Sequence, residues 1–134
     1  MKQEQAKILL SIKPEYADLI FSGKKKYEFR RTIFKNKDVK TVVVYASSPV
    51  QKVIGEFQID SILQTDLKNL WRQTKKFAGI KEDYFYEYFS NKSDGFAIKI
   101  AKTRRYRKTL CIKKDLKLFP PQSFLYLYSS NFQM

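Results

Sequence analysis

The sequence predicts a single domain of the α+β class, spanning residues 1–134, in which about six strands form a small closed or nearly closed β-barrel with about three flanking helices. A chain of 134 residues is the usual size of one domain. Its 43% hydrophobic and 16% aromatic residues are enough for a packed core. Segments with the two-residue period of strands outnumber those with helical spacing and do not alternate with them regularly, which favours α+β over a parallel α/β fold.

The first half of the chain carries most of the strand signals. After the first predicted strand, Pro14 is expected to begin a short helix, because proline is tolerated at the first helical position. Gly23 suits the left-handed residue that follows a helix, and Gly55 marks a bulge or a close approach of another segment. The predicted strands are residues 7–12, residues 26–30, the β-branched residues 41–45 that are expected to be buried on both faces, and residues 52–63.

The second half of the chain predicts two helices and two further strands. Thr65 or Asp66 can cap a helix that ends near Gly79. A second helix covers about residues 81–89, with four aromatic side chains at core spacing. The remaining segments are a strand from residue 96 that runs into a strongly basic hairpin or turn at 103–108, a loop at 115–122, a last strand at 124–128 and a frayed tail from 129.

Net charge is the most informative bulk property of the chain. Lys and Arg number 27 against 13 Asp and Glu, which gives a formal net charge of +14. Such an excess strengthens association with polyanions, so RNA is the first expected partner and DNA is an alternative. Lysines that only keep the protein soluble, or an acidic protein partner, explain the same charge, whereas no amphipathic basic helix points to a membrane surface. The sequence leaves the oligomeric state open.

Several chemistries are excluded by the residues that the sequence lacks. Without histidine, and with Cys111 as its single cysteine, the chain offers no zinc ligand set, no Ser-His or Cys-His nucleophile pair and no internal disulfide. Its four glycines are too scattered for a nucleotide-binding loop, so neither a metal nor a cofactor is expected. The absence of a long apolar run and of a secretion signal favours a soluble, cytoplasmic protein. Any catalysis must use Lys, Glu, Asp, Ser, Thr or Tyr.

One motif, G-x-K-x-x-E-x-R, is formed by Gly23, Lys25, Glu28 and Arg30. Glu28 can orient neighbouring cations through charge-assisted hydrogen bonds and so prepare them for phosphates or base edges. The alternative is an exposed ion pair on a solvated strand, which contributes about 0–1 kcal/mol. The motif resembles that of the ASCH domain family within the PUA-like superfamily, as do Val-Val-Tyr-Ala-Ser and Ile-Gly-Glu-Phe after it and Pro-Pro-Gln-Ser-Phe near the end of the chain.

This resemblance implies a PUA-like β-barrel that binds RNA or a modified base through a cleft lined by residues 23–31. Some bacterial relatives are hydrolases of N4-acetylcytidine or ribonucleases. In the amidohydrolases a threonine nucleophile stands where this chain has Glu28, next to the lysine matched by Lys25, and this difference argues against amide hydrolysis. An enzyme would use Glu28 as general base and Lys25 as proton donor or oxyanion stabiliser. Enzyme activity therefore stays open, and a protein-interaction regulator is a third alternative.

Further candidates for nucleic-acid contacts lie outside the motif. Arg104 and Arg105 belong to a basic cluster that suits phosphates. Ser47 and Ser48 follow a buried strand, where PUA-like proteins place residues at the mouth of the cleft, although serines before a proline are also ordinary turn residues. The complete predicted set is Lys25, Lys26, Glu28, Arg30, Arg31, Ser47, Ser48, Arg104, Arg105, Gln122 and Ser123.

Overall fold

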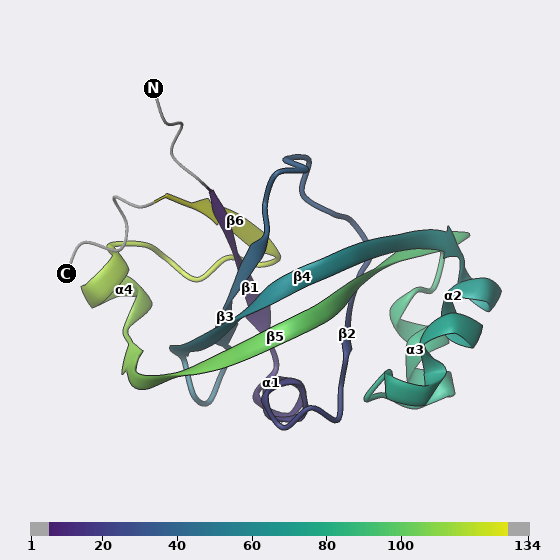
Figure 1. The fold of residues 1–134 in the computed structure, drawn as a ribbon, viewed down its shortest axis with the longest axis horizontal. Coiled ribbons are helices and arrows are strands. Elements are labelled where there is room, and N and C mark those ends of the chain that lie inside the picture. Colours follow the sequence, from purple (N-terminus) through teal and green to yellow (C-terminus); the bar gives the residue numbers. More distant parts are fainter. Residues whose placement is uncertain (1–5, 129–134) are drawn as a thin grey trace.

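Six strands form one mixed sheet in the structure of the protein, a computed structural model that describes residues 6–128 (Figure 1). Strands β1 and β3 are parallel, and all other neighbouring pairs are antiparallel. From one edge to the other the strands are β2 (Tyr27–Arg30), β5 (Asp94–Leu110), β4 (Lys52–Asp66), β3 (Thr41–Ala46), β1 (Lys7–Ile12) and β6 (Phe124–Leu127). The predicted number of strands is therefore confirmed, and the predicted frayed tail from residue 129 lies outside the described residues.

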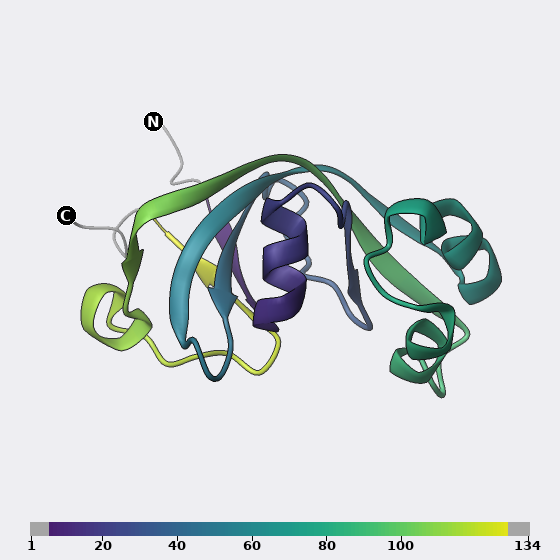
Figure 2. The ribbon, with the colours of Figure 1, turned by 90° about the horizontal axis from the view of Figure 1, so that it is seen from below.

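The sheet does not close, so the closed form of the predicted barrel is wrong and a barrel describes the fold only roughly. Its two edge strands, β2 and β6, have four residues each and lie at opposite ends of the strand order. Strong curvature comes instead from the long strands β4 and β5, which arch over α1 (Pro14–Phe21) (Figure 2). The sequence does not distinguish an open sheet from a barrel, because the number of strands and their alternation do not reveal whether the two edge strands pair.

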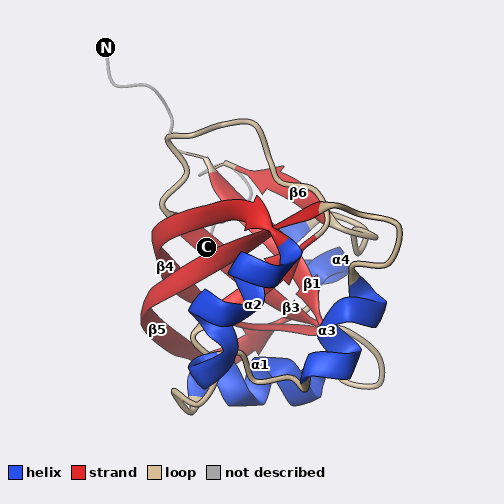
Figure 3. Cartoon of the chain, turned by 90° about the vertical axis from the view of Figure 1, so that its right-hand side faces the viewer, coloured by secondary structure: helices blue, strands red, loops and turns tan. Residues whose placement is uncertain are grey.

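The three predicted helices are present, and a fourth was not predicted. Helix α2 (Leu67–Thr74) is capped by Asp66, whose Oδ2 accepts a hydrogen bond from the Asn69 backbone N–H at 3.3 Å. A 3-10 turn, η1 (Lys75–Phe77), leads to α3 (Glu82–Tyr88), and Figure 3 shows α2 and α3 in front of one end of the sheet. No helix in the described part of the chain is long and apolar enough to cross a membrane.

The additional helix, α4 (Ile112–Leu116), overlaps the segment that was predicted as a loop from residue 115. This helix has five residues and ends at Lys117, which has a left-handed φ of 59°. Glycine is the usual residue at such a position, so the sequence pattern does not predict that the helix ends there. Ile112 and Leu116 are both buried, at a spacing of four. The Asp115 carboxylate also accepts a hydrogen bond from the Cys111 backbone N–H at 2.7 Å. The helix is thus stabilised by the packing of its two apolar residues against the sheet.

The basic segment 103–108 is part of a continuous strand, and the predicted hairpin or turn is wrong there. Strand β5 runs for 17 residues and pairs with β4, which itself extends three residues beyond its predicted end at residue 63. Neither strand needs an apolar face along this whole length, because each provides the backbone hydrogen-bond partners of the other. Charged residues therefore continue the strand where composition alone favours a turn.

The buried residues form three clusters, and the sheet separates two of them. Alternate residues of β3 point to opposite faces, as predicted: Val42 and Val44 pack with α1, whereas Val43 and Tyr45 pack with α4. The third cluster joins β2 and β5 to α2 and α3, and its fully buried rings belong to Phe85 and Phe89. This third cluster holds α3 against β2 and thereby positions the cleft described below.

Gly55 lies where both α1 and β5 approach β4. A Cβ at this position would be 2.6 Å from the Arg104 carbonyl oxygen and 2.6 Å from Cζ of Phe21, and the strand register shifts beside it. We expect Gly55→Ala to lower the free energy of unfolding by about 2 kcal/mol, because a well-packed region must move to admit the methyl group. Urea denaturation measures this difference, and an unchanged stability would contradict the close approach.

Candidate functional site

A cleft of about 160 Å³ lies between α1, β2 and α3. Three of the residues that the motif predicts for a binding site contribute to its walls, namely Lys25, Glu28 and Arg30. The turn after α1 brings this segment into place, since Gly23 takes a left-handed φ of 82° as predicted. The other lining residues are Ser11, Ile12, Lys13, Tyr16, Phe29, Ile80, Tyr84 and Tyr88.

Lys25 lies at the base of the cleft with 2% of its surface exposed. Its Nζ donates a hydrogen bond to the Ala78 carbonyl oxygen at 2.6 Å and lies 4.9 Å from the centre of the Phe29 ring. Burial lowers the pKa of Lys25 to about 8, and the nearby Glu28 carboxylate opposes part of that shift. Groups with a pKa perturbed in this way are concentrated at functional sites.

Glu28 and Arg30 form a buried ion pair beside this lysine. The distance between Glu28 Oε2 and Arg30 Nη1 is 3.1 Å, and the two side chains are 9% and 12% exposed. The alternative of an exposed ion pair on a solvated strand is therefore wrong. Nη2 of Arg30 also donates to the Ser123 hydroxyl at 2.9 Å and to the Ser123 carbonyl at 3.1 Å. These contacts fix the guanidinium between β2 and the segment that precedes β6, so little of its freedom remains to be lost on binding.

Three tyrosines join Phe29 in the aromatic part of the cleft. The rings of Tyr16 and Tyr84 lie 5.9 Å apart, and Tyr88 donates its hydroxyl proton to the Phe29 carbonyl at 3.1 Å. Burial raises the pKa of Tyr16 and of Tyr88, and for Tyr16 a hydrogen bond with Tyr84 adds to the effect. These two hydroxyls therefore stay protonated at neutral pH.

The spacing of the aromatic residues in the third helix predicts core positions, which is confirmed for Phe85 and Phe89 and in part for Tyr88, because Tyr88 packs against their cluster and also lines the cleft. Phe85 and Phe89 are fully buried, whereas Tyr84 and Tyr88 line the cleft. The sequence contains one signal for this difference. Tyr84 and Tyr88 lie four residues apart and carry hydroxyl groups, whereas Phe85 and Phe89 have the same spacing and are purely apolar. Ser11, at the end of β1, carries no comparable signal.

Other predicted residues of the motif region lie outside the cleft. Nζ of Lys26 lies 4.4 Å from the centre of the Phe77 ring. Arg31 donates to the carbonyls of Tyr88 and Ser90 at 2.8 and 2.9 Å, so it ties β2 to the end of α3. Ser47, Ser48 and Gln122 are not among the residues that line the cleft. Ser48, in a turn, and Gln122, in the bend before β6, are exposed to solvent.

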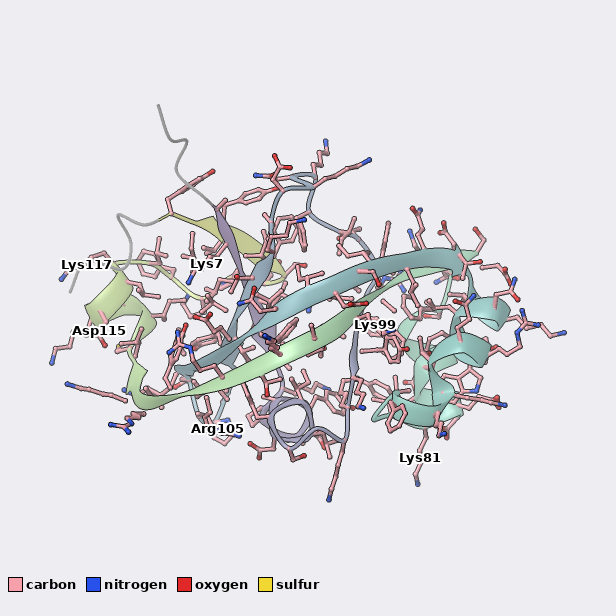
Figure 4. The ribbon with its side chains drawn as sticks, in the orientation of Figure 1. Lys7, Lys81, Lys99, Arg105, Asp115 and Lys117 are labelled. Atoms are coloured by element: carbon pink, nitrogen blue, oxygen red, sulfur yellow. The ribbon has the colours of Figure 1, made fainter. Side chains whose placement is uncertain are left out.

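Arg104 and Arg105 are separated from the cleft and from each other. Because neighbouring residues of a strand point to opposite faces, Arg104 pairs with Glu56 at 3.0 Å, whereas Arg105, labelled in Figure 4, pairs with Asp18 of α1 at 3.3 Å. Glu56 is 7% exposed and also accepts a hydrogen bond from the Tyr106 hydroxyl at 2.8 Å. The predicted set thus divides into Lys25, Glu28 and Arg30 in the cleft, Ser123 bound to Arg30, and residues that lie elsewhere.

Comparison with known proteins gives related results from sequence and from structure. The model of the ASCH domain matches residues 10–110. An ASCH domain-containing ribonuclease of Zymomonas mobilis is 31% identical over 133 residues, which cover 97% of this chain and 90% of that protein. Large ribosomal subunit protein uL22 of Ureaplasma parvum is 30% identical over 90% of this chain, but the match spans 39% of that protein.

The crystal structure of the ASCH protein from Zymomonas mobilis has the same fold. Its TM-score is 0.85 at 30% identity, over 93% of this chain and 90% of that one. Crystal structures of a serine-to-alanine and of a tyrosine-to-phenylalanine variant of that protein give the same TM-score. The extent of these matches, together with the motif at the base of the cleft, shows that the chain belongs to the ASCH domain family.

Proposed function

We propose that the protein is a ribonuclease that binds single-stranded RNA in the cleft and cleaves it with Lys25 and Glu28. The observation that carries this proposal is a buried lysine of lowered pKa beside a carboxylate–arginine pair. Its chain is 31% identical, over nearly its whole length, to a protein named as a ribonuclease. RNA binding is the broader part of the proposal, and cleavage is the narrower part.

The size and chemistry of the cleft suit the base of one nucleotide. A volume of about 160 Å³ is below the roughly 300–1,000 Å³ of sites that bury drug-sized ligands. The rings of Tyr16 and Tyr84 offer apolar faces for a base, and sequence-tolerant stacking of this kind is how proteins hold unpaired bases. Arg30 presents a positive charge for the phosphate, and the net charge of +14 attracts the polyanion.

Cleavage by the 2′-hydroxyl needs no group that this chain lacks. Glu28 takes the proton of the 2′-hydroxyl, whose oxygen attacks the adjacent phosphorus. The bond from phosphorus to the 5′-oxygen breaks, and Lys25 gives its proton to that oxygen. The products are a 2′,3′-cyclic phosphate and a 5′-hydroxyl. Arg30 balances the charge that develops on the phosphate oxygens. DNA is not a substrate for this reaction, because it has no 2′-hydroxyl.

RNA binding without cleavage is the second candidate. This candidate is favoured because the charged groups of the cleft already have hydrogen-bond partners within the protein. Arg30 is bound by Glu28 and Ser123, and Nζ of Lys25 donates to the Ala78 carbonyl. A protein-interaction regulator has less support, because the exposed large apolar side chains lie on different elements. They are Val50, Ile62, Phe77, Tyr86, Phe119 and Tyr128.

Glu28→Gln tests the two candidates. The amide retains an oxygen for Arg30 but cannot take a proton, so we expect RNA cleavage to fall at least about 100-fold, with the dissociation constant for RNA within about threefold of the wild-type value. Gel analysis of end-labelled RNA and DNA of one sequence, combined with fluorescence titration, measures both quantities. Asp18→Asn is the matched control, because it makes the same chemical change in an exposed ion pair.

Each outcome of this experiment has a distinct meaning. Equal cleavage by the wild type and Glu28→Gln would show that Glu28 is not the base. RNA binding with a steep salt dependence, but no cleavage by the wild type, would favour the second candidate. If the wild type neither binds nor cleaves RNA at low salt, the proposed function is wrong.

A further inference from the structure

A second, larger groove of about 650 Å³ lies beside the cleft. It runs between the loop of residues 33–40 and residues 59–64 of β4, and Phe96 of β5 also lines it. The two concavities share no lining residue. They are nevertheless close, because Arg30 of the cleft is the direct strand partner of Phe96, and cross-strand partners have Cβ atoms about 5 Å apart.

The loop that forms one wall of this groove is held firmly in place. Phe34 and Val39 anchor it in the core, where they are 5% and 4% exposed. The backbone N–H groups of Lys35 and Asn36 both donate to the Tyr126 hydroxyl at 3.1 Å. At its end, the Lys40 carbonyl accepts a hydrogen bond from the Ile59 N–H at 2.8 Å. Side chains on this loop are therefore presented from a fixed backbone.

The groove combines positive charge with an apolar floor. Lys35, Lys37 and Lys40 are exposed, and none of the three forms an ion pair with another residue in the described range 6–128. Asp60, which also lines the groove, pairs at 3.8 Å with Lys99 of β5, which is labelled in Figure 4. The floor includes Ile59, Ile62 and Phe96. Ammonium groups without ion-pair partners and apolar side chains in one groove suit the alternating phosphates and bases of single-stranded RNA.

A depression that adjoins the cleft carries mostly negative charge, unlike the groove. It shares Tyr16 and Tyr84 with the cleft and is lined by Glu15, Asp83 and Glu87, with Lys81 as its single lining cation. Phosphates are repelled from such a surface and attracted to the groove of Lys35, Lys37 and Lys40. An RNA chain that places one nucleotide in the cleft is thus directed to one side.

We propose that the groove between residues 33–40 and 59–64 binds the part of the RNA chain that continues from the nucleotide in the cleft. Its lysines contact phosphates, and Phe96 and Ile62 contact a base. This proposal rests on the proposed function and adds to it a second binding surface and a direction for the RNA. Short RNA that fills the cleft alone does not use this surface.

The test compares a dinucleotide with an RNA of about ten nucleotides, each fluorescently labelled and titrated at several salt concentrations. The variant replaces all three groove lysines by alanine. We expect its affinity for the longer RNA to fall roughly 10- to 100-fold at about 0.1 M salt, and its log–log salt slope to lose about two units, because each lost contact to a single strand removes about 0.7. Binding of the dinucleotide is expected to stay within about twofold of the wild-type affinity.

The matched control removes three exposed lysines outside the groove, Lys75, Lys113 and Lys114. This control lowers the net charge by the same amount, so it measures how much the overall positive charge contributes to RNA binding. If the groove variant and this control bind the longer RNA with equal affinity, the proposed role of the groove is wrong, whereas the proposed role of the cleft is unaffected. Failure of the wild type to bind RNA of either length would overturn the proposed function, and the groove with it.

Discussion

Lys25→Met is expected to lower RNA cleavage at pH 7 at least about 1,000-fold and to make the folded protein more stable. The activity is lost because the variant has neither the proton for the leaving oxygen nor the positive charge beside it, effects that are each worth about 100-fold or more. With its pKa lowered to about 8, Lys25 is a stronger acid than a solvated lysine and is still protonated at pH 7. In the wild type, we expect the rate to decrease about tenfold per pH unit above pH 8.

The gain in stability follows from the same burial. A shift of the pKa from 10.5 to about 8 means that the folded state holds this ammonium at a disadvantage of about 3 kcal/mol relative to the unfolded chain. Loss of the hydrogen bond to Ala78 offsets part of this, so we expect a net gain of about 1–2 kcal/mol at pH 7. Between pH 8 and 10.5 the unfolded chain binds more protons at this residue than the folded one. The wild type therefore gains stability from Lys25 as the pH rises, and its difference from the variant shrinks.

Lys24→Met provides the control, since Lys24 is the exposed neighbour of the same turn. It is expected to change neither cleavage by more than about threefold nor stability by more than about 0.5 kcal/mol. Cleavage assays across pH 6–10 and urea denaturation at pH 7 and 10 measure these effects. A Lys25→Met protein that retains a tenth of the wild-type activity would rule out Lys25 as the proton donor.

The sequence predicts the base of the cleft because its determinants are local. Gly23 turns the chain after α1, and the period of two in β2 places Glu28 and Arg30 on one side. All the residues of the motif lie within eight positions, so backbone geometry alone brings them together. The wall from Tyr84 and Tyr88 depends instead on how α3 packs against a strand more than 50 residues earlier, and spacing within α3 does not specify that contact.

The errors in the predicted fold have the same origin. Whether six strands close into a barrel depends on where β2 and β6 lie relative to each other, and no local pattern reports this. The basic segment 103–108 continues β5 because β4 pairs with it, although its composition alone favours a turn. By contrast, β3 was predicted correctly as a strand buried on both faces, because an unbroken β-branched run is a local signal of burial on two sides.

Phe85→Ala is expected to lower the free energy of unfolding by about 4 kcal/mol, the usual size of the effect when a large ring is removed from a core. Phe85 is fully buried, and its ring centre lies 5.3, 5.0 and 4.9 Å from those of Phe29, Trp71 and Phe89. Removing it leaves these rings without their shared neighbour, at a point where α2, α3 and β2 meet. Urea denaturation measures the loss.

Tyr86→Ala is the matched control on the same helix. The Tyr86 ring lies 5.1 Å from that of Phe85, but Tyr86 is 39% exposed, so its expected cost is below about 1 kcal/mol. Equal costs for the two variants would show that this aromatic cluster does not hold α3 in place. The cluster also reaches the candidate site, since Nζ of Lys25 lies over the Phe29 ring that Phe85 contacts. Phe85→Ala is therefore expected to raise the pKa of Lys25 towards its ordinary value as water enters, which moves the fall of the pH–rate profile to higher pH.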